Sequence, residues 1–268
     1  MNGLPSAAGK YVLISIGMSN TTQEWCSQSS APPCAAWTLM GRASADLEVN
    51  RSNLVIVNGA AAGQAADTWS APTAANYDRI RDVRLGPLGL GEKQVQAAWV
   101  KLAVANPRVG LPADSANARV LFRQLGEVTR SLKTRYPNLQ LVFFSSRIYA
   151  GYATTQLSPE PFAYEEGFAV KWLIDAQIAE ARGNPPNATA GTLSYAAGAA
   201  AWLGWGPYLW ANGTSARSDG LSWNPDDFQG DGTHPSQSGE SKVGAMLLAF
   251  FKTSPYTRCW FLAGQICG

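Results

Sequence analysis

The sequence has 268 residues, of which 46% are hydrophobic and 15% charged, with a formal net charge of +2 at pH 7. This length and composition can bury the core of one large domain, so we expect a single domain over residues 1–268. The charges are spread along the chain, and no run is apolar enough for a membrane-spanning helix, so we expect neither a nucleic-acid nor a membrane partner.

The expected elements alternate, in chain order, between short apolar runs and helical patterns. The first run, 11–16, is β-branched and ends at Gly17, as a buried strand that leads into a loop would. The patterns that follow are strands at 54–57, 95–100 and 139–144, and helices at 114–136, at 162–182 and from about Ser236 onward. Residues 183–230 are rich in Gly, Pro, Asn and aromatic residues and are expected to form long ordered loops.

Strands that alternate with helices predict an α/β fold with a mainly parallel sheet. In an open parallel sheet the ligand crevice lies beyond the carboxyl ends of the strands. The loops that start at Gly17, Asn58 and Val100 should therefore converge on one site.

The four cysteines form two sequence-local pairs, Cys26 with Cys34 and Cys259 with Cys267. This spacing favours two small disulfide loops over a metal site, although four cysteines allow three connectivities. Disulfides form in oxidising surroundings, so the pattern predicts a secreted or periplasmic protein whose export signal has been removed. The alternative is four reduced thiols in a cytosolic protein.

His234 is the chain's one histidine, so a neutral imidazole acting as general base must be this residue. It follows Asp231 by three residues, in Asp-Gly-Thr-His, where the carboxylate can turn back to the ring and fix its tautomer. A lone histidine is more often structural than catalytic, so the hypothesis needs a nucleophile.

Gly17-Met-Ser19-Asn20 directly follows the first expected strand and offers that nucleophile. The glycine lets the loop turn and leaves the Ser19 hydroxyl at the carboxyl end of the strand. Its backbone N–H would face the same space and could stabilise an oxyanion. By itself, a serine in such a turn can equally be a helix cap.

Together, the Gly-x-Ser after the first strand and the Asp-x-x-His before the last helix resemble the first and last sequence blocks of SGNH (GDSL-like) hydrolases. Val57-Asn-Gly-Ala-Ala-Ala-Gly63 is similar to the second block, whose final glycine, here Gly63, supplies an oxyanion-hole N–H. The resemblance implies a three-layer α/β/α, flavodoxin-like fold. It also implies ester hydrolysis through an acyl-enzyme on Ser19, with His234 as base, Asp231 as its partner and no cofactor or metal.

Two departures from the family pattern bear on substrate and mechanism. Met18 and Asn20 replace the Asp and Leu of Gly-Asp-Ser-Leu, and the resulting Gly-x-Ser-Asn resembles sialate O-acetylesterases, which implies sugar esters and a role for Asn20 in substrate binding. The third block, Gly-x-Asn-Asp, is absent, and Trp99-Val-Lys101 is similar to a Trp-x-Gln segment of the sialate-type members. Lys101, with Gln96 as fallback, is therefore the expected side-chain donor to the oxyanion, although a solvated lysine is the simpler interpretation.

Five aromatic residues precede the Asp-x-x-His motif, namely Trp202, Trp205, Tyr208, Trp210 and Trp223. Aromatic faces suit sugar rings or acyl groups, and Tyr208 and Trp210 are the candidates to face substrate, although large rings often only fill a core. The predicted partner is a small-molecule or polysaccharide ester. The alternatives are a carbohydrate-binding protein without catalysis and an acyltransferase that uses the same three residues; the oligomeric state is not predicted.

Overall fold

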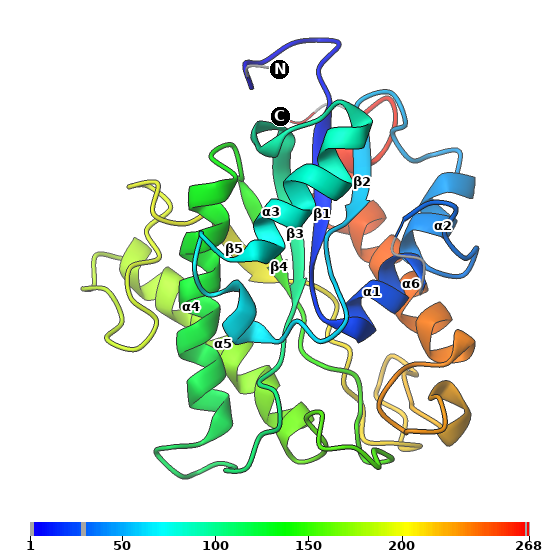
Figure 1. The fold of residues 1–268 in the computed structure, drawn as a ribbon, viewed down its shortest axis with the longest axis vertical. Coiled ribbons are helices and arrows are strands. Elements are labelled where there is room, and N and C mark those ends of the chain that lie inside the picture. The colour runs from blue at the N-terminus through cyan, green and yellow to red at the C-terminus, as the bar shows by residue number, and fades with distance from the viewer. Residues whose placement is uncertain (1–2, 28–30, 266, 268) are drawn as a thin grey trace.

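The computed structural model describes residues 3–27, 31–265 and 267. Its centre is a five-stranded sheet in the order β2-β1-β3-β4-β5, in which every neighbouring pair is parallel. This order is the flavodoxin-like one. The strands are β1 (Tyr11–Gly17), β2 (Leu54–Asn58), β3 (Val95–Lys101), β4 (Leu141–Phe144) and β5 (Trp202–Trp205) (Figure 1).

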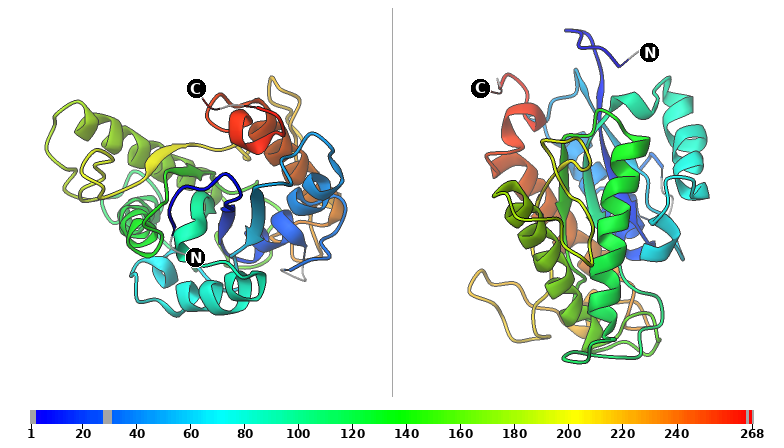
Figure 2. Two further views of the ribbon diagram at one scale, coloured as in Figure 1. Left: turned by 90° about the horizontal axis from the view of Figure 1, so that it is seen from above. Right: turned by 90° about the vertical axis from the view of Figure 1, so that its left-hand side faces the viewer.

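Helices cover both faces of this sheet, giving the expected three layers (Figure 2). The α-helices are α1 (Ser19–Cys26), α2 (Leu39–Ala45), α3 (Ala75–Arg79), α4 (Asn117–Arg135), α5 (Phe162–Ala181), α6 (Gln237–Thr253) and α7 (Arg258–Phe261). Shorter 3-10 or π-helical turns occupy Ala66–Trp69, Ile80–Leu85, Gly86–Leu88, Glu92–Gln94 and Pro225–Asp227.

Strand alternation divides the apolar side chains between two cores. Val12, Ile14 and Ile16 of β1 point to one face, where α3, α4 and α5 pack, whereas Leu13 points to the face covered by α1, α2, α6 and α7. Each face of the sheet is therefore buried, as its nearly continuous apolar strands require.

The four expected strands and three expected helices are confirmed, with small shifts at their ends. The expectation that 183–230 holds only loops is wrong, because β5 lies there and pairs with β4 from Leu141↔Trp202 to Phe144↔Trp205. With the sequence Trp-Leu-Gly-Trp, β5 is too short to show a period and contains a glycine, a residue depleted in strands.

Both expected cysteine pairs are disulfides, Cys26–Cys34 and Cys259–Cys267. Cys26 is the last residue of α1, and Cys259 lies within α7. Within the described residues, no helix is long and apolar enough to cross a membrane.

Candidate active site

The candidate nucleophile lies where β1 meets α1, at the carboxyl edge of the sheet. Ser19 is the first residue of α1, and β1 ends two residues earlier at Gly17. A Cβ on Gly17 would lie 2.3 Å from Thr21 Oγ1 and 2.4 Å from the carbonyl oxygen of Lys101. Only glycine allows this close approach of the turn to β3, so the Gly-x-Ser spacing has a steric cause.

Ser19, His234 and Asp231 form a continuous hydrogen-bonded chain. Ser19 Oγ lies 2.8 Å from His234 Nε2, and His234 Nδ1 lies 2.6 Å from Asp231 Oδ2. This is the order in which a nucleophile, its base and the group that orients the base act. The structure therefore brings together the three residues that the sequence singled out.

The turn that carries Asp231 and His234 is held by its own backbone. Asp231 Oδ1 accepts hydrogen bonds from the backbone N–H groups of Thr233 at 2.9 Å and His234 at 3.0 Å. Gly232 has φ +63°, and a Cβ there would lie 1.9 Å from the carbonyl oxygen of Tyr152. The loop can therefore close only with glycine at this position.

Asn20 connects α1 to the turn that carries Asp231 and His234, which we call the histidine turn. Its side-chain Nδ2 donates to the carbonyl oxygen of Thr233 at 3.0 Å, and the residue is buried. Asn20 also lines the cavity at Ser19. Its amide N–H is thus engaged in positioning His234, which adds a role to the expected one in substrate binding.

The carboxylate of Asp231 is held in its charged form. Partial burial would raise its pKa, but hydrogen bonds from the backbone and ring of His234 and from Thr233 outweigh that effect and lower the pKa of Asp231. An ionised Asp231 orients Nδ1–H toward itself, leaves Nε2 free to accept the Ser19 proton and stabilises the imidazolium that forms.

A cavity of about 290 Å³ opens at Ser19 and is mostly apolar. Its walls come from the loops after β1, β2, β3 and β4 and from the histidine turn; the lining residues are Met18, Ser19, Asn20, Ala62, Gly63, Ala65, Ala103, Val104, Ala105, Arg147, Leu157, Thr233 and His234. The convergence of loops expected at the carboxyl edge is thereby confirmed.

Two backbone N–H groups are available as oxyanion donors. Ser19 is the first residue of α1, where an N–H has no acceptor within its own helix. Gly63 lines the cavity opposite, in a left-handed turn with φ +73°. Both positions agree with the expectation for Ser19 and Gly63, and the positive end of the α1 dipole adds to the field at the nucleophile.

The expected side-chain donors are wrong. Lys101 is fully buried, and its ammonium forms an ion pair with Glu24 of α1. Lys101 follows Trp99 by two residues on β3, so both side chains lie on the face of the sheet that α1 covers, with Lys101 Nζ 5.9 Å from the Trp99 ring centre. Gln96 is exposed near the start of β3, at the opposite edge of the sheet. The residues that follow β3 in the cavity wall, Ala103 and Val104, offer no polar side chain.

Arg147 is a cavity residue that the sequence analysis missed. It follows β4 by three residues, is only 2% exposed and donates from Nη1 to the carbonyl oxygen of Leu157 at 3.0 Å. Two buried carboxyl groups, Glu24 and Glu166, interact electrostatically with it. The sequence feature that could have identified Arg147 is a charged residue just past the carboxyl end of a strand, in Ser145-Ser146-Arg147.

The aromatic candidates lie outside the Ser19 cavity. Trp210 is half-buried and donates from Nε1 to Glu160 Oε1 at 2.8 Å, and Trp223 is fully buried. Tyr208 is partly exposed and lines a different cavity, together with Trp205. Neither Tyr208 nor Trp210 is positioned to contact an ester at Ser19.

No model of a protein family matches the chain, and no curated protein matches it. Solved structures do match over most of its length. A protein from Arabidopsis thaliana has a TM-score of 0.48 at 12% identity over 91% of this chain and 98% of its own. A GDSL-like lipase from Bacteroides thetaiotaomicron has a TM-score of 0.44 at 12% identity, over 91% of this chain and 86% of its own. An extracellular lipase from Streptomyces rimosus has a TM-score of 0.39 at 14% identity, over 90% of this chain and 99% of its own.

At such identities and TM-scores these likenesses identify neither the family nor the substrate, and the chemistry must come from the residues. Within the part of the chain that the structure describes, no group of three or more His, Cys, Asp or Glu residues could hold a metal ion. The polar groups at the site include a serine, an imidazole, a carboxylate and backbone donors, which together suit acyl transfer, and the Asn20 amide and Arg147 guanidinium lie in the same cavity wall.

Proposed function

We propose that this protein is a serine esterase of the SGNH (GDSL-like) type that hydrolyses carboxylic esters through an acyl-enzyme on Ser19. The observation that carries the proposal is the chain from Ser19 Oγ through His234 to Asp231, with both links at hydrogen-bond distance. Its place at the carboxyl edge of a parallel sheet, in a mostly apolar cavity, supports it.

In the proposed reaction Ser19 Oγ attacks the ester carbonyl while His234 Nε2 takes the hydroxyl proton. His234 then returns this proton to the leaving alkoxide, and the C–O bond to the alcohol breaks, leaving an ester on Ser19. Water repeats the sequence and releases the acid. The oxyanion forms twice, and the N–H groups of Ser19 and Gly63 donate to it.

We further propose small acyl groups, acetyl above all, carried on a carbohydrate. The alanine-rich cavity of about 290 Å³ suits a short acyl chain. The Gly-x-Ser-Asn block, which resembles that of sialate O-acetylesterases, supports the carbohydrate part. The two disulfides support an exported protein that meets its substrate in an oxidising compartment.

A carbohydrate-binding protein without catalysis is the second candidate. The cavity wall after β3 carries alanine and valine where an oxyanion-hole side chain would stand, and this observation favours weak chemistry. An acyltransferase would use the same three residues and differ only in whether an alcohol or water resolves the acyl-enzyme.

Turnover of 4-nitrophenyl acetate by the wild type, by Ser19→Ala and by the exposed control Ser52→Ala tests the proposal. We expect the wild type and Ser52→Ala to share one kcat/KM and Ser19→Ala to lose at least about 10³-fold. Equal turnover by all three proteins would remove the esterase assignment. Product analysis with an added alcohol then separates hydrolysis from acyl transfer.

A further inference from the structure

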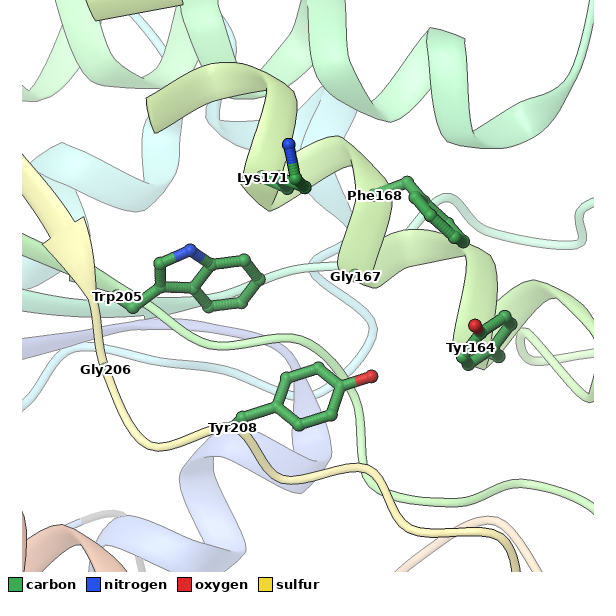
Figure 3. A pocket seen from close by; sticks show the side chains of 7 residues that line it. All are labelled: Tyr164, Gly167, Phe168, Lys171, Trp205, Gly206 and Tyr208. Carbon is green, nitrogen blue, oxygen red and sulfur yellow. The ribbon is translucent and has the colours of Figure 1, made fainter. Parts of the chain in front are cut away.

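A second cavity, of about 370 Å³, lies between α5 and the segment that follows β5. One wall is a single stripe of α5, because Tyr164, Gly167, Phe168 and Lys171 are spaced i, i+3, i+4 and i+7. The other wall is Trp205, Gly206 and Tyr208, and Figure 3 shows the Trp205 and Tyr208 rings on the side opposite the α5 residues. Four aromatic side chains thus surround one open hollow, which we call the aromatic cleft.

Contacts within the aromatic cleft and around it hold its rings in place. The Trp205 and Tyr208 ring centres are 5.9 Å apart at 79°, an edge-to-face pair. The guanidinium of Arg217 lies 5.3 Å from the Tyr208 ring centre and donates to the carbonyl oxygen of Tyr208 at 2.8 Å. Across the cleft, Tyr164 packs on Trp210 at 4.6 Å. A ligand would meet rings already in place, so little ordering entropy would oppose its binding.

Gly167 keeps the aromatic cleft open. A Cβ at this position would meet Tyr208 Cε2 at 3.5 Å, an ordinary contact, so the packing leaves room for alanine. Glycine in a helix interior is destabilising relative to alanine, and α5 is otherwise regular here. The missing side chain therefore contributes space in front of Tyr208 rather than stability.

The aromatic cleft and the Ser19 cavity lie on two sides of the same wall. The Cβ position of Gly167 is 3.8 Å from Ser146 Cβ, and the next residue, Arg147, lines the Ser19 cavity. Both cavities thus open at the carboxyl end of the sheet, beyond β5 and beyond β1 to β4 respectively. The two cavities are therefore neighbours, separated by the segment that carries Ser146 and Arg147.

We propose that the aromatic cleft is a binding subsite for a neutral pyranose ring of the carbohydrate whose ester is cleaved at Ser19. The inference rests on the proposed function for the link to the ester, but the binding of the sugar itself does not. Two perpendicular rings present a face and an edge to the C–H surfaces of one pyranose. The hydroxyls of Tyr164 and Tyr208 are polar partners for its hydroxyl groups.

Charge and size argue against other ligands. Lys171, the charged side chain among the described lining residues, is paired with Asp175 at 2.6 Å, so the aromatic cleft offers no unpaired charge to a charged ligand. The cleft is open to solvent, so a long acyl chain would stay largely exposed there.

Isothermal titration with unacetylated oligosaccharides tests the subsite without any turnover. The probes are xylohexaose, cellohexaose, mannohexaose and chitohexaose, and the proteins are the wild type, Tyr208→Ala, Gly167→Leu and Tyr195→Ala. Tyr208→Ala removes a ring, Gly167→Leu fills the cleft, and Tyr195→Ala is a matched control because Tyr195 is exposed but lies outside the cleft. Thermal melting shows which variants are folded.

We expect at least one probe to bind the wild type and Tyr195→Ala equally, and to bind Tyr208→Ala and Gly167→Leu at least tenfold more weakly. In kinetics, the two cleft variants should lose at least tenfold more kcat/KM on the acetylated form of that oligosaccharide than on 4-nitrophenyl acetate. Absence of binding by all four probes, or binding that folded cleft variants retain, would overturn the subsite.

The failure of each proposal has its own signature. Hydrolysis of 4-nitrophenyl acetate that depends on Ser19, without binding of any probe, leaves the esterase and removes the subsite. Probe binding that depends on Tyr208, without ester turnover, leaves the subsite and removes the esterase.

Discussion

Two acid–base pairs lie close to the ends of β1 and β3, and they differ in their access to solvent and substrate. His234 and Asp231 are 20% and 31% exposed at the side chain, and His234 lines a cavity, whereas Lys101 and Glu24 are fully buried. A base that is partly open to solvent and bonded to a serine can pass a proton to a substrate. A pair sealed in the core has no substrate to reach, so its charges can only hold α1 against β3.

The pKa values of Lys101 and Glu24 reflect the burial of this pair. Burial lowers the pKa of Lys101 to about 8 and raises the pKa of Glu24, while the charge of each partner opposes the change in the other. Perturbed values of this kind often mark active sites, but structural ion pairs give them too. Contact with a cavity, rather than the size of the shift, separates the two pairs.

Replacing Asp231 with Asn should have the largest effect on activity and little effect on stability. The amide cannot stabilise the imidazolium or select the productive tautomer, so kcat should fall by about 10⁴-fold, with KM nearly unchanged. The free energy of unfolding should change by less than about 1 kcal/mol because the side chain is partly exposed. Steady-state kinetics and urea unfolding measure the two effects, and a loss in stability as large as that in activity would contradict the distinction between the pairs.

Replacing Lys101 with Met should have a large effect on stability and little effect on the activity of the folded protein. It leaves the Glu24 carboxylate buried without its cation and should destabilise the fold by about 3–5 kcal/mol. The double variant Lys101→Met with Glu24→Leu removes both charges and should recover most of that loss in urea unfolding, while it keeps esterase activity. A stable single variant with kcat reduced 100-fold would restore the catalytic role that the sequence suggested for Lys101.

Glu166 is another buried ionisable group, and its carboxyl accepts a hydrogen bond from Ser158 Oγ at 2.7 Å. Burial raises its pKa from 4.5 to about 8, against the opposing charge of Arg147. The folded state therefore keeps a proton that the unfolded chain releases, so stability should fall as the pH rises from about 4.5 to about 8.

Glu166→Gln removes this titration, and the stability of the wild type relative to the variant should decline over that range by at most about 1.4 kcal/mol per pH unit. Urea unfolding at pH 5, 6, 7 and 8 measures the decline. Parallel stability curves for the two proteins would show that Glu166 is ionised in the folded state.

The sequence sufficed for the parts of the site that local rules determine. A single histidine, an aspartate three residues before it and a serine just past a strand gave the hydrogen-bonded chain from Ser19 to Asp231. The alternation of β3 placed Lys101 on the side of Trp99, but its partner Glu24 comes from a helix distant in sequence, and no local pattern reveals that contact. Arg147 and β5 were missed for a similar reason, since burial and strand pairing depend on tertiary packing.

The central claim, that Ser19 is the nucleophile activated by His234, is tested most directly by a serine-reactive fluorophosphonate followed by intact-mass and peptide mass analysis. We expect one adduct per chain, located on Ser19, that forms rapidly in the wild type, slowly in His234→Ala and not at all in Ser19→Ala. An adduct on another serine, or labelling of Ser19 at the same rate without His234, would contradict it.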